Sequence, residues 1–416
     1  MDSSLCLALA GCFFWGSWSA PLSSARMKAV PFALVLLDVA LGFLIAATAL
    51  LTWRPLLFSA GDTSAASLAL SVGVALASGA VHQSAEGVIL GAQRAYGIAA
   101  TMPPAIGTAL VLGTAGMYAV DRRGSLPRLA AGVSLALAAI CALVGSRVLH
   151  QRHAATAVAS AAMPASAGAE SGSALQGREL TCSTSAAAVS VGVGAEPAKD
   201  LLPPHVARSV VRPGDGRLRD ALRPCLVAIG GGLMLCLWSP LAALPQVLPN
   251  RSARLTGEGA CALLLVAKAA ASVPLALVIN GSGGRGRLFG PRQPRLWRAW
   301  ACHPARERAL GMMAGLGWAG GTVCTLLAGR GAMGFAMAYA IGETAPMVGA
   351  LWGLLCFREL EGAPASAWAA QGAMFALYIS AIALIAGGRG GEPLDAGDGL
   401  NTNTGLDGSQ SHARYP

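Results

Sequence analysis

Ten long stretches of this sequence are apolar and almost free of charged residues. They lie near residues 5–22, 30–53, 68–92, 96–120, 129–148, 224–248, 259–280, 309–329, 333–357 and 366–387. A helix that crosses a bilayer needs about 20 mostly apolar residues, so each stretch predicts one membrane span. Only 12% of the 416 residues are charged, about half the share found in a soluble domain. The sequence therefore predicts an all-α integral membrane protein with ten transmembrane helices.

The ten stretches form two groups of five, in residues 1–148 and 224–388. Residues 149–223 separate them and are rich in Ala, Ser, Gly and Pro, which predicts a disordered linker. The tail at 389–416 has a similar composition and predicts disorder as well. Asp2 precedes the first stretch, and this acid favours a retained span over a cleaved signal peptide.

The two groups share short motifs at corresponding positions. Residues 18–22 read WSAPL in the first span, and residues 238–241 read WSPL in the sixth. A P-x-x-G pattern occurs at 104–107 in the fourth span and at 346–349 in the ninth. An odd number of spans per half inverts the second copy in the membrane, as in many secondary transporters. We therefore predict two inverted five-helix repeats.

The basic residues predict the orientation. Most Lys and Arg lie in the segments on one side of the spans, at 23–29, 93–95, 149–223, 281–308 and 358–365. Cytosolic loops carry such an excess, so this side is expected to be cytosolic and both termini to be extracellular or lumenal. The net charge of +10 is thus a sign of topology, and we expect no nucleic acid as a partner.

Three segments resemble one transporter family. Residues 12–18, CFFWGSW, resemble the opening helix of ureide permeases and their bacterial relatives in the drug/metabolite transporter superfamily. Residues 102–113, MPPAIGTALVLG, are similar to that family's fourth-span FPxGIGxALVLG segment. Residues 338–360, AYAIGETAPMVGALWGLLCFREL, are similar to its ninth-span block, which ends in LWGxxxWxEF. The resemblance covers both halves and implies proton-coupled uptake of nitrogen-rich heterocycles, such as allantoin and uracil, at the plasma membrane.

The chain also departs from that family. Plant members carry a Walker-A-like stretch in the central loop, whereas no GxxxxGK[ST] occurs here, so no ATP or other cofactor is expected. Glu86 stands where members often have Asn, and Glu343 where relatives often have Gln. Both differences place acid inside the membrane, so the substrate is not carried over from the family.

Five ionisable residues lie well inside the predicted spans: Asp38, His82, Glu86, Lys268 and Glu343. Placing one charged side chain at the centre of the bilayer costs at least ~2.5–3.5 kcal/mol, so each of these residues is expected to have a structural or functional role. Three acids face one lysine, and desolvation disfavours the charged form of a carboxyl. At least one acid should therefore be protonated, as a proton-coupled symporter requires. The candidates for proton coupling are Glu343, Asp38 and Glu86.

Glu343 is expected near the bilayer midplane, between Gly342 and Pro346, where the helix should weaken and free backbone groups for a ligand. The alternative is a permanently protonated Glu in an interhelical hydrogen bond. For Asp38 the alternative is a structural contact with Ser17, Ser19 or Lys268.

Lys268 lies in the middle of the seventh span, as a counter-ion for Asp38 or Glu343 or as a direct substrate contact. His82 and Glu86 are four residues apart and share a helix face, with Gln83 beside them. They predict a gate or proton exit, or else a polar stripe facing a water-filled vestibule.

Uncharged residues complete the candidate site. Aromatic rings that could stack on a flat heterocycle belong to Trp15, Trp18, Trp318 and Trp352, although such residues are also common in packing and at interfaces. Hydrogen bonds to a substrate are expected from Gln83, Tyr339 and Gln371. Pro104 and Pro346 are interpreted as helix breaks near the site.

The leading hypothesis is a secondary active transporter whose partners are a small-molecule substrate, protons and the lipid bilayer. A transporter of sugars or other small metabolites from the same superfamily is the alternative. A membrane-embedded enzyme needs clustered nucleophiles or His/Asp pairs, which this pattern does not indicate. A passive channel fits the duplicated halves and midplane breaks less well. The ten cysteines form no CxxC pair and no spacing typical of a metal site.

Overall fold

The computed structural model describes residues 3–24, 27, 29–53, 65–96, 98–162, 217–247, 255–282 and 293–388. All regular elements among them are helical. In chain order these are α1 (Ser3–Ser17), η1 (Pro21–Ser23), α3 (Phe32–Trp53), α4 (Ala65–Tyr96), α5 (Ile98–Val120), α6 (Leu126–Ala162), α7 (Arg217–Val247), α8 (Gly257–Ser282), α9 (Leu296–Ala301), α10 (Ala305–Arg330), α11 (Phe335–Gly342), α12 (Pro346–Leu355) and α13 (Ala365–Gly387).

Nine helices of the described part are long and apolar enough to cross a membrane, which is the architecture of an all-α, multi-pass membrane protein. The remaining predicted span, the ninth in chain order, near 333–357, is formed by two short helices, α11 and α12, with a turn at 343–345 between them. Pro346 starts α12, where its missing N–H and fixed φ are tolerated. Each piece alone is shorter than a bilayer requires.

The predicted linker is helical at both of its ends. Helix α6 continues to Ala162, well past residue 148, and α7 begins at Arg217. The prediction of disorder was wrong for 149–162, because this segment is rich in alanine, the residue with the highest helix propensity. The rest of the predicted linker, 163–216, and the tail at 389–416 lie outside the described residues.

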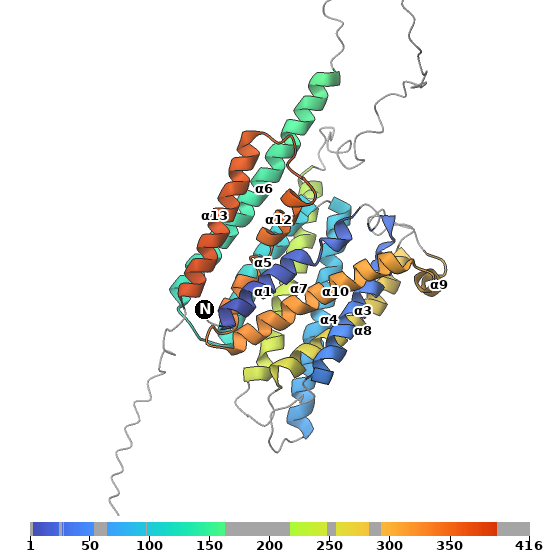
Figure 1. Ribbon diagram of the computed structural model, residues 1–416, viewed down its shortest axis with the longest axis vertical. Helices are drawn as coiled ribbons and strands as arrows, with labels where there is room; N and C mark the ends of the chain where they lie inside the picture. Colours follow the sequence, from blue (N-terminus) through green and yellow to red (C-terminus); the bar gives the residue numbers. More distant parts are fainter. Residues whose placement is uncertain are drawn as a thin grey trace, which may run out of the picture.

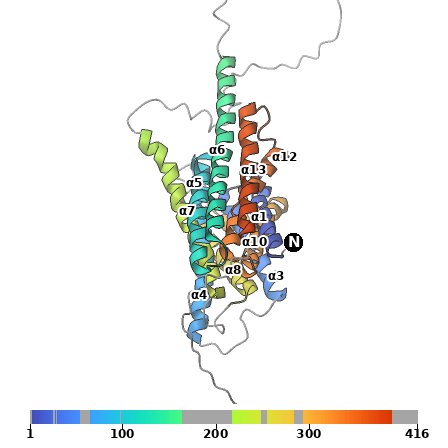
Figure 2. The ribbon, with the colours of Figure 1, turned by 90° about the vertical axis from the view of Figure 1, so that its left-hand side faces the viewer.

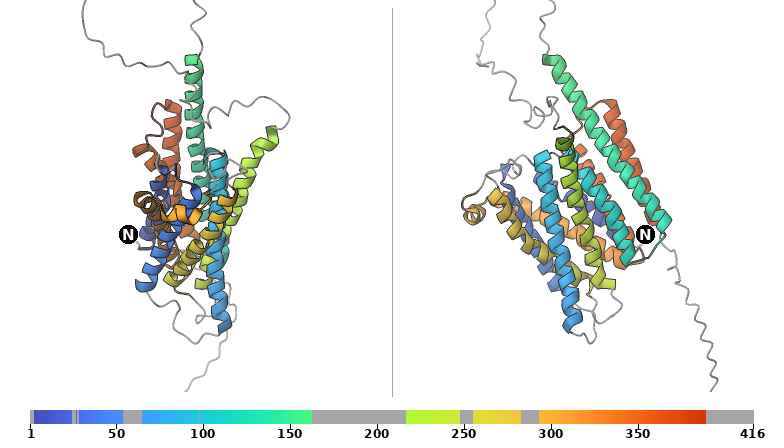
Figure 3. Two further views of the ribbon diagram at one scale, coloured as in Figure 1. Left: turned by 90° about the vertical axis from the view of Figure 1, so that its right-hand side faces the viewer. Right: turned by 180° about the vertical axis from the view of Figure 1, so that it is seen from behind.

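The helices form a bundle with one pair set at its edge. Helices α6 and α13 lie side by side, and α6 extends beyond the rest of the bundle (Figures 1 and 2). In the main body, α7 lies between α4 and α5 (Figure 3). Helix α8 packs on α3 and α4, while α10 packs on α1 and α3.

Glycines set how closely these helices approach. Where α3 crosses α10, Gly42 meets Gly315, and a Cβ on Gly315 would collide with the carbonyl of Val39. Where α4 crosses α8, a Cβ on Gly79 would collide with the carbonyl of Leu264. Small residues permit such close backbone contact in membrane helices. The side chains between these crossings are therefore held in a narrow space.

One end of the bundle is closed by an arginine clasp, formed by Arg123 and Asp121 in the loop between α5 and α6. Arg123 donates to both carboxylate oxygens of Asp121 at 2.8–2.9 Å, and to the carbonyls of Gly329 and Gly331 at 2.9 Å. Asp121 in turn accepts a hydrogen bond from the backbone N–H of Phe335 at 3.1 Å. The clasp thus satisfies the end of α10 and the start of α11, two helix termini whose backbone groups need partners.

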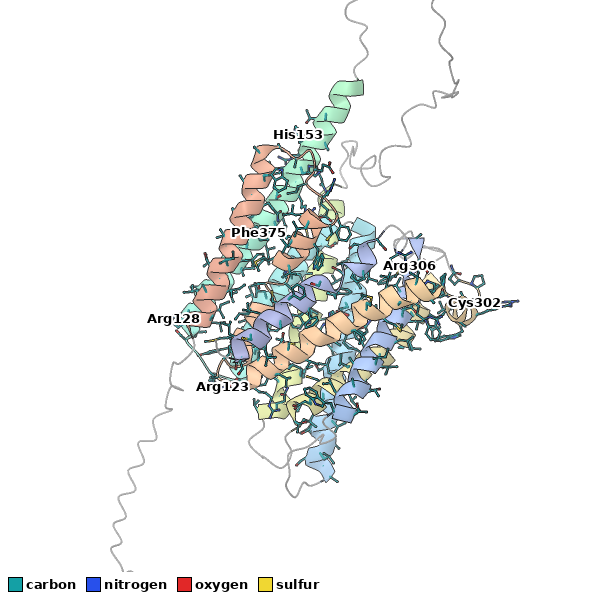
Figure 4. All side chains as sticks on the ribbon, in the orientation of Figure 1. Arg123, Arg128, His153, Cys302, Arg306 and Phe375 are labelled. Carbon is teal, nitrogen blue, oxygen red and sulfur yellow. The ribbon has the colours of Figure 1, made fainter. Side chains whose placement is uncertain are left out.

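The short helix α9 lies at the opposite end of the bundle. Figure 4 shows Arg123 and Arg128 at the first end, and Cys302 and Arg306 beside α9 at the other. At the α9 end an ion pair also joins Arg147 of α6 to Glu359, which follows α12. Both ends are therefore tied by charged side chains.

Candidate functional site

The centre of the bundle contains an ion pair between α8 and α4. The Nζ of Lys268 donates to Oε2 of Glu86 at 2.9 Å, with the lysine fully buried and the Glu86 side chain 15% exposed. The sequence suggested Asp38 or Glu343 as the counter-ion, which was wrong because α8 packs against α4 at this level. Two desolvated charges are tolerated only when they compensate each other closely, as these do.

His82 extends the pair by one helical turn. Its Nε2 lies 3.6 Å from Oε1 of Glu86, and its Nδ1 is buried without a hydrogen-bond partner. The imidazole ring lies 4.3 Å from the Trp238 ring and 4.3 Å from the Trp318 ring, measured between centroids. A polar stripe facing a water-filled vestibule was therefore a wrong alternative, because His82 is only 3% exposed.

Aromatic side chains from five helices surround the ion pair. This aromatic cluster consists of Trp15 on α1, Phe43 on α3, Trp238 on α7, Trp318 on α10 and Tyr339 on α11. The Lys268 ammonium lies 3.1 Å from the Trp318 ring centroid and 4.9 Å from that of Phe43. A cation over an indole face is attracted by the ring's quadrupole, most strongly when water is excluded. The ammonium is thus held by a carboxylate and by aromatic faces together.

Glu343 lies in the turn between α11 and α12, beside the aromatic cluster. It is 8% exposed, and the preceding Gly342 lies against the Trp15 ring. The next residue, Thr344, contacts Cys12 of α1 at 3.3 Å between side chains and donates to the carbonyl of Ile341 at 2.6 Å. Tyr339 of the cluster donates its hydroxyl to the carbonyl of Ala109 at 3.2 Å and so joins α11 to α5.

Asp38 is fully buried but belongs to a separate group at the α9 end. It accepts a hydrogen bond from Trp300 Nε1 at 2.8 Å and contacts His303 Nδ1 at 2.9 Å, with Arg308 Nε at 3.7 Å. The predicted contacts with Ser17, Ser19 or Lys268 were wrong, because α9 and the turn after it fold over this end of α3. Asp38 thus fixes α9 to the bundle.

The remaining polar and aromatic candidates lie outside the ion-pair contacts. Trp352 donates its indole N–H to Ser17 at 2.8 Å, which links α12 to α1. Within the described part of the chain, the Trp18 ring forms no stacked or edge-on pair with a ring of the aromatic cluster, although it packs against the hydrophobic core. Gln83 and Gln371 are buried, and the Oε1 of each lacks a hydrogen-bond partner. These two amides keep free capacity for a ligand.

The two prolines behave differently. Pro346 directly follows the turn at 343–345. Pro104, in contrast, lies within an uninterrupted α5, so its interpretation as a helix break was wrong. The hydroxyl of Thr108 donates to the carbonyl of Pro104 at 2.7 Å. This bond adds a second donor to a carbonyl that the N–H of Thr108 already faces, whereas Pro104 removes the N–H that would reach the carbonyl of residue 100.

Trp238 and Phe43 were not singled out from the sequence. Trp238 opens the WSPL motif that parallels residues 18–22, so the internal repeat itself was a usable signal. Phe43 is a common apolar residue in an apolar span and had no such signal.

Within the described residues, no three His, Cys, Asp or Glu side chains gather as they would around a metal ion. No family model, no curated protein and no solved structure matches the chain.

Proposed function

We propose that the chain is a secondary active transporter that takes up small nitrogen-rich heterocycles with protons. The observation that carries the proposal is the buried Lys268–Glu86 pair with His82, enclosed by aromatic rings where helices of both halves converge. Ionisable residues at this depth mark substrate or ion pathways in membrane proteins. The lysine can donate to a carbonyl and the carboxylate can accept from an N–H, while the indoles can stack on a flat ring.

The pattern of helix contacts supports two related halves. Each helix of the first half has a counterpart in the second half under the repeat, in the order α1, α3, α4, α5 and α6 with α7, α8, α10, α11–α12 and α13. When each helix is exchanged for its counterpart, the main helix–helix contacts become other contacts that the structure also contains. The packing of α4 on α7 and α8 becomes that of α10 on α1 and α3, and both sets occur. The pairs α3–α8 and α6–α13 map onto themselves, and both occur. Such symmetry favours alternating access between two inverted repeats.

The basic residues support an orientation with the α9 end in the cytosol. Arg295, Arg298 and Arg306 are exposed at this end. Arginine accumulates on the cytosolic side of membrane proteins. The termini then lie on the opposite side, and the plasma membrane is the expected location.

Proton coupling is assigned to Glu343 and Glu86. Glu343 lies at a helix break beside the aromatic cluster, where a carboxyl can gain and lose a proton as the bundle changes shape. Asp38 is held by three partners at the α9 end, and we assign it a role in that contact rather than in coupling.

The test is uptake into proteoliposomes under an inward proton gradient, with radiolabelled uracil and allantoin and with glucose for comparison. The wild type should accumulate a heterocycle, and Lys268→Met and Glu86→Gln should not. Glu361→Gln, at an exposed position, is the matched control and should transport normally. Accumulation of glucose alone would favour the sugar-transporter alternative, and chemical conversion of a substrate would favour an enzyme.

A further inference from the structure

The imidazole of His82 occupies a place suited to a ligand ring. Its centroid lies 4.3 Å from that of Trp238, with the planes tilted by 34°, which is close to stacking. It meets Trp318 edge to face, also at 4.3 Å and at 76°. The two indoles are 6.3 Å apart with their planes tilted by 55°, so they form an angled recess, called the slot below, in which the imidazole lies against both. Such offset and edge-on arrangements are those that aromatic rings prefer.

The hydrogen bonding of His82 is incomplete in this slot. Its Nδ1 has no partner although the residue is 3% exposed, and its Nε2 lies 3.6 Å from Glu86, beyond ordinary hydrogen-bond length. A histidine kept only for packing would be expected to satisfy its buried nitrogens. The slot therefore matches the shape of a flat nitrogen-containing ring, but it leaves the hydrogen bonds of the His82 imidazole unmade.

The surrounding groups indicate what would fit better. The carboxylate of Glu86 can accept from a ring N–H, and Lys268 retains N–H donors beyond its single bond to Glu86. The two groups are 2.9 Å apart, so they can address neighbouring atoms of one ligand. A ring that carries an N–H next to a carbonyl, as in cyclic amides and ureides, satisfies both.

We infer that the slot between Trp238 and Trp318 is the seat for the substrate's ring, and that His82 fills this seat when no substrate is bound. The inference rests on the proposed function and names its substrate class: flat five- or six-membered rings with an N–H beside a carbonyl. On loading, the imidazole leaves the slot and the ring replaces it between the two indoles. Flat rings are favoured over saturated, puckered ones, because the imidazole nearly stacks on one indole and meets the other edge to face.

The experiment removes the imidazole from the slot and measures whether a free ring binds in its place. His82→Ala keeps a helix-forming residue in α4 while it removes the imidazole. Purified protein in detergent is titrated with imidazole and with pyrrolidine, a saturated ring of the same size, by calorimetry. Ser84→Ala is the matched control, since Ser84 lies two residues further along α4 with its side chain exposed. We expect His82→Ala to bind imidazole about tenfold more tightly than the wild type and Ser84→Ala do, from one stacked aromatic contact.

A second variant covers the possibility that His82→Ala fails to fold. His82→Phe keeps a flat ring in the slot permanently and should retain the wild-type melting temperature while losing uracil binding. Equal imidazole binding by His82→Ala and Ser84→Ala would overturn the inference, as would normal uracil binding by His82→Phe. The proposed function fails separately: if His82→Ala binds imidazole but the wild type transports no heterocycle, the seat stands and the transporter proposal falls. If the wild type transports uracil but His82→Ala binds no imidazole, the transporter proposal stands and the inference about the slot falls.

Discussion

Removal of one partner of the central ion pair should destabilise the protein strongly. Lys268 is fully buried, donates one charge-assisted hydrogen bond to Glu86 at 2.9 Å and lies 3.1 Å above Trp318. Such a hydrogen bond contributes about 1.5–3 kcal/mol and a desolvated cation–aromatic contact about 2 kcal/mol. We therefore expect Lys268→Met to lower the free energy of unfolding by about 3–5 kcal/mol, the cost of breaking a buried ion pair. Glu86→Leu should cost a similar amount, because it leaves the ammonium without its carboxylate.

The double variant Glu86→Leu/Lys268→Met should recover most of this loss. Replacing a buried ion pair with apolar side chains of similar volume is often neutral or stabilising, so we expect it within about 1 kcal/mol of the wild type. The resulting coupling energy is at least about 3 kcal/mol, since the single losses do not add. The double variant should nevertheless fail to transport, because the two side chains to which the proposed function assigns substrate binding are gone.

Unfolding can be followed by titrating sodium dodecyl sulfate into mixed micelles, with tryptophan fluorescence and circular dichroism as two probes. The Arg147–Glu359 pair is the matched control, since its side chains are 27% and 41% exposed. A cycle of Arg147→Met and Glu359→Leu should give a coupling of about 0–1 kcal/mol, as surface pairs do. A coupling at the central pair no larger than at this control would refute the reasoning.

Three further predictions concern the clasp, the broken helix and the helix crossings. Arg123→Ala should lower the melting temperature through a loss of about 1–3 kcal/mol of hydrogen bonds, whereas Arg122→Ala, which is exposed, should not. Glu343→Gln should abolish uptake driven by a pH gradient while counterflow exchange continues; uptake with unchanged pH dependence would remove Glu343 from coupling. Gly315→Ala should destabilise by about 1–3 kcal/mol through its collision with α3. Gly145→Ala, with open space around it, should stabilise α6 by about 0.5–1 kcal/mol in the same unfolding assay.

The sequence predicts the spans well because apolar length is a local property. The stretch at 366–387 is apolar over its whole length and must be surrounded by lipid or protein. The structure forms α13 over nearly the same residues. The disturbance before Pro346 is local too, since Gly342 and Pro346 both weaken a helix. Pro104 shows the limit, because α5 continues through it although a proline removes one backbone donor.

The sequence could not predict which charges meet. Counting residues along a helix gives the depth of Asp38 or Glu86, but not the neighbour that each one faces. That neighbour depends on the crossings of α3 with α10 and of α4 with α8, which glycines set through contacts distant in sequence. The segment after residue 292 has little apolar length, so its folding back onto Asp38 through Trp300 and His303 left no pattern to detect.

Helix α10 contacts three of the charged groups of the bundle. Its first turns contact Asp38 through Arg308, its middle places Trp318 under the Lys268 ammonium, and its last carbonyls are held by Arg123. In the proposed transport cycle, a substrate ring that displaced Trp318 would act on a helix that is anchored near both of its ends. Because α10 joins the ion pair to the contacts at Asp38 and at Arg123, it is the element through which the proposed alternating access would couple the two ends of the bundle.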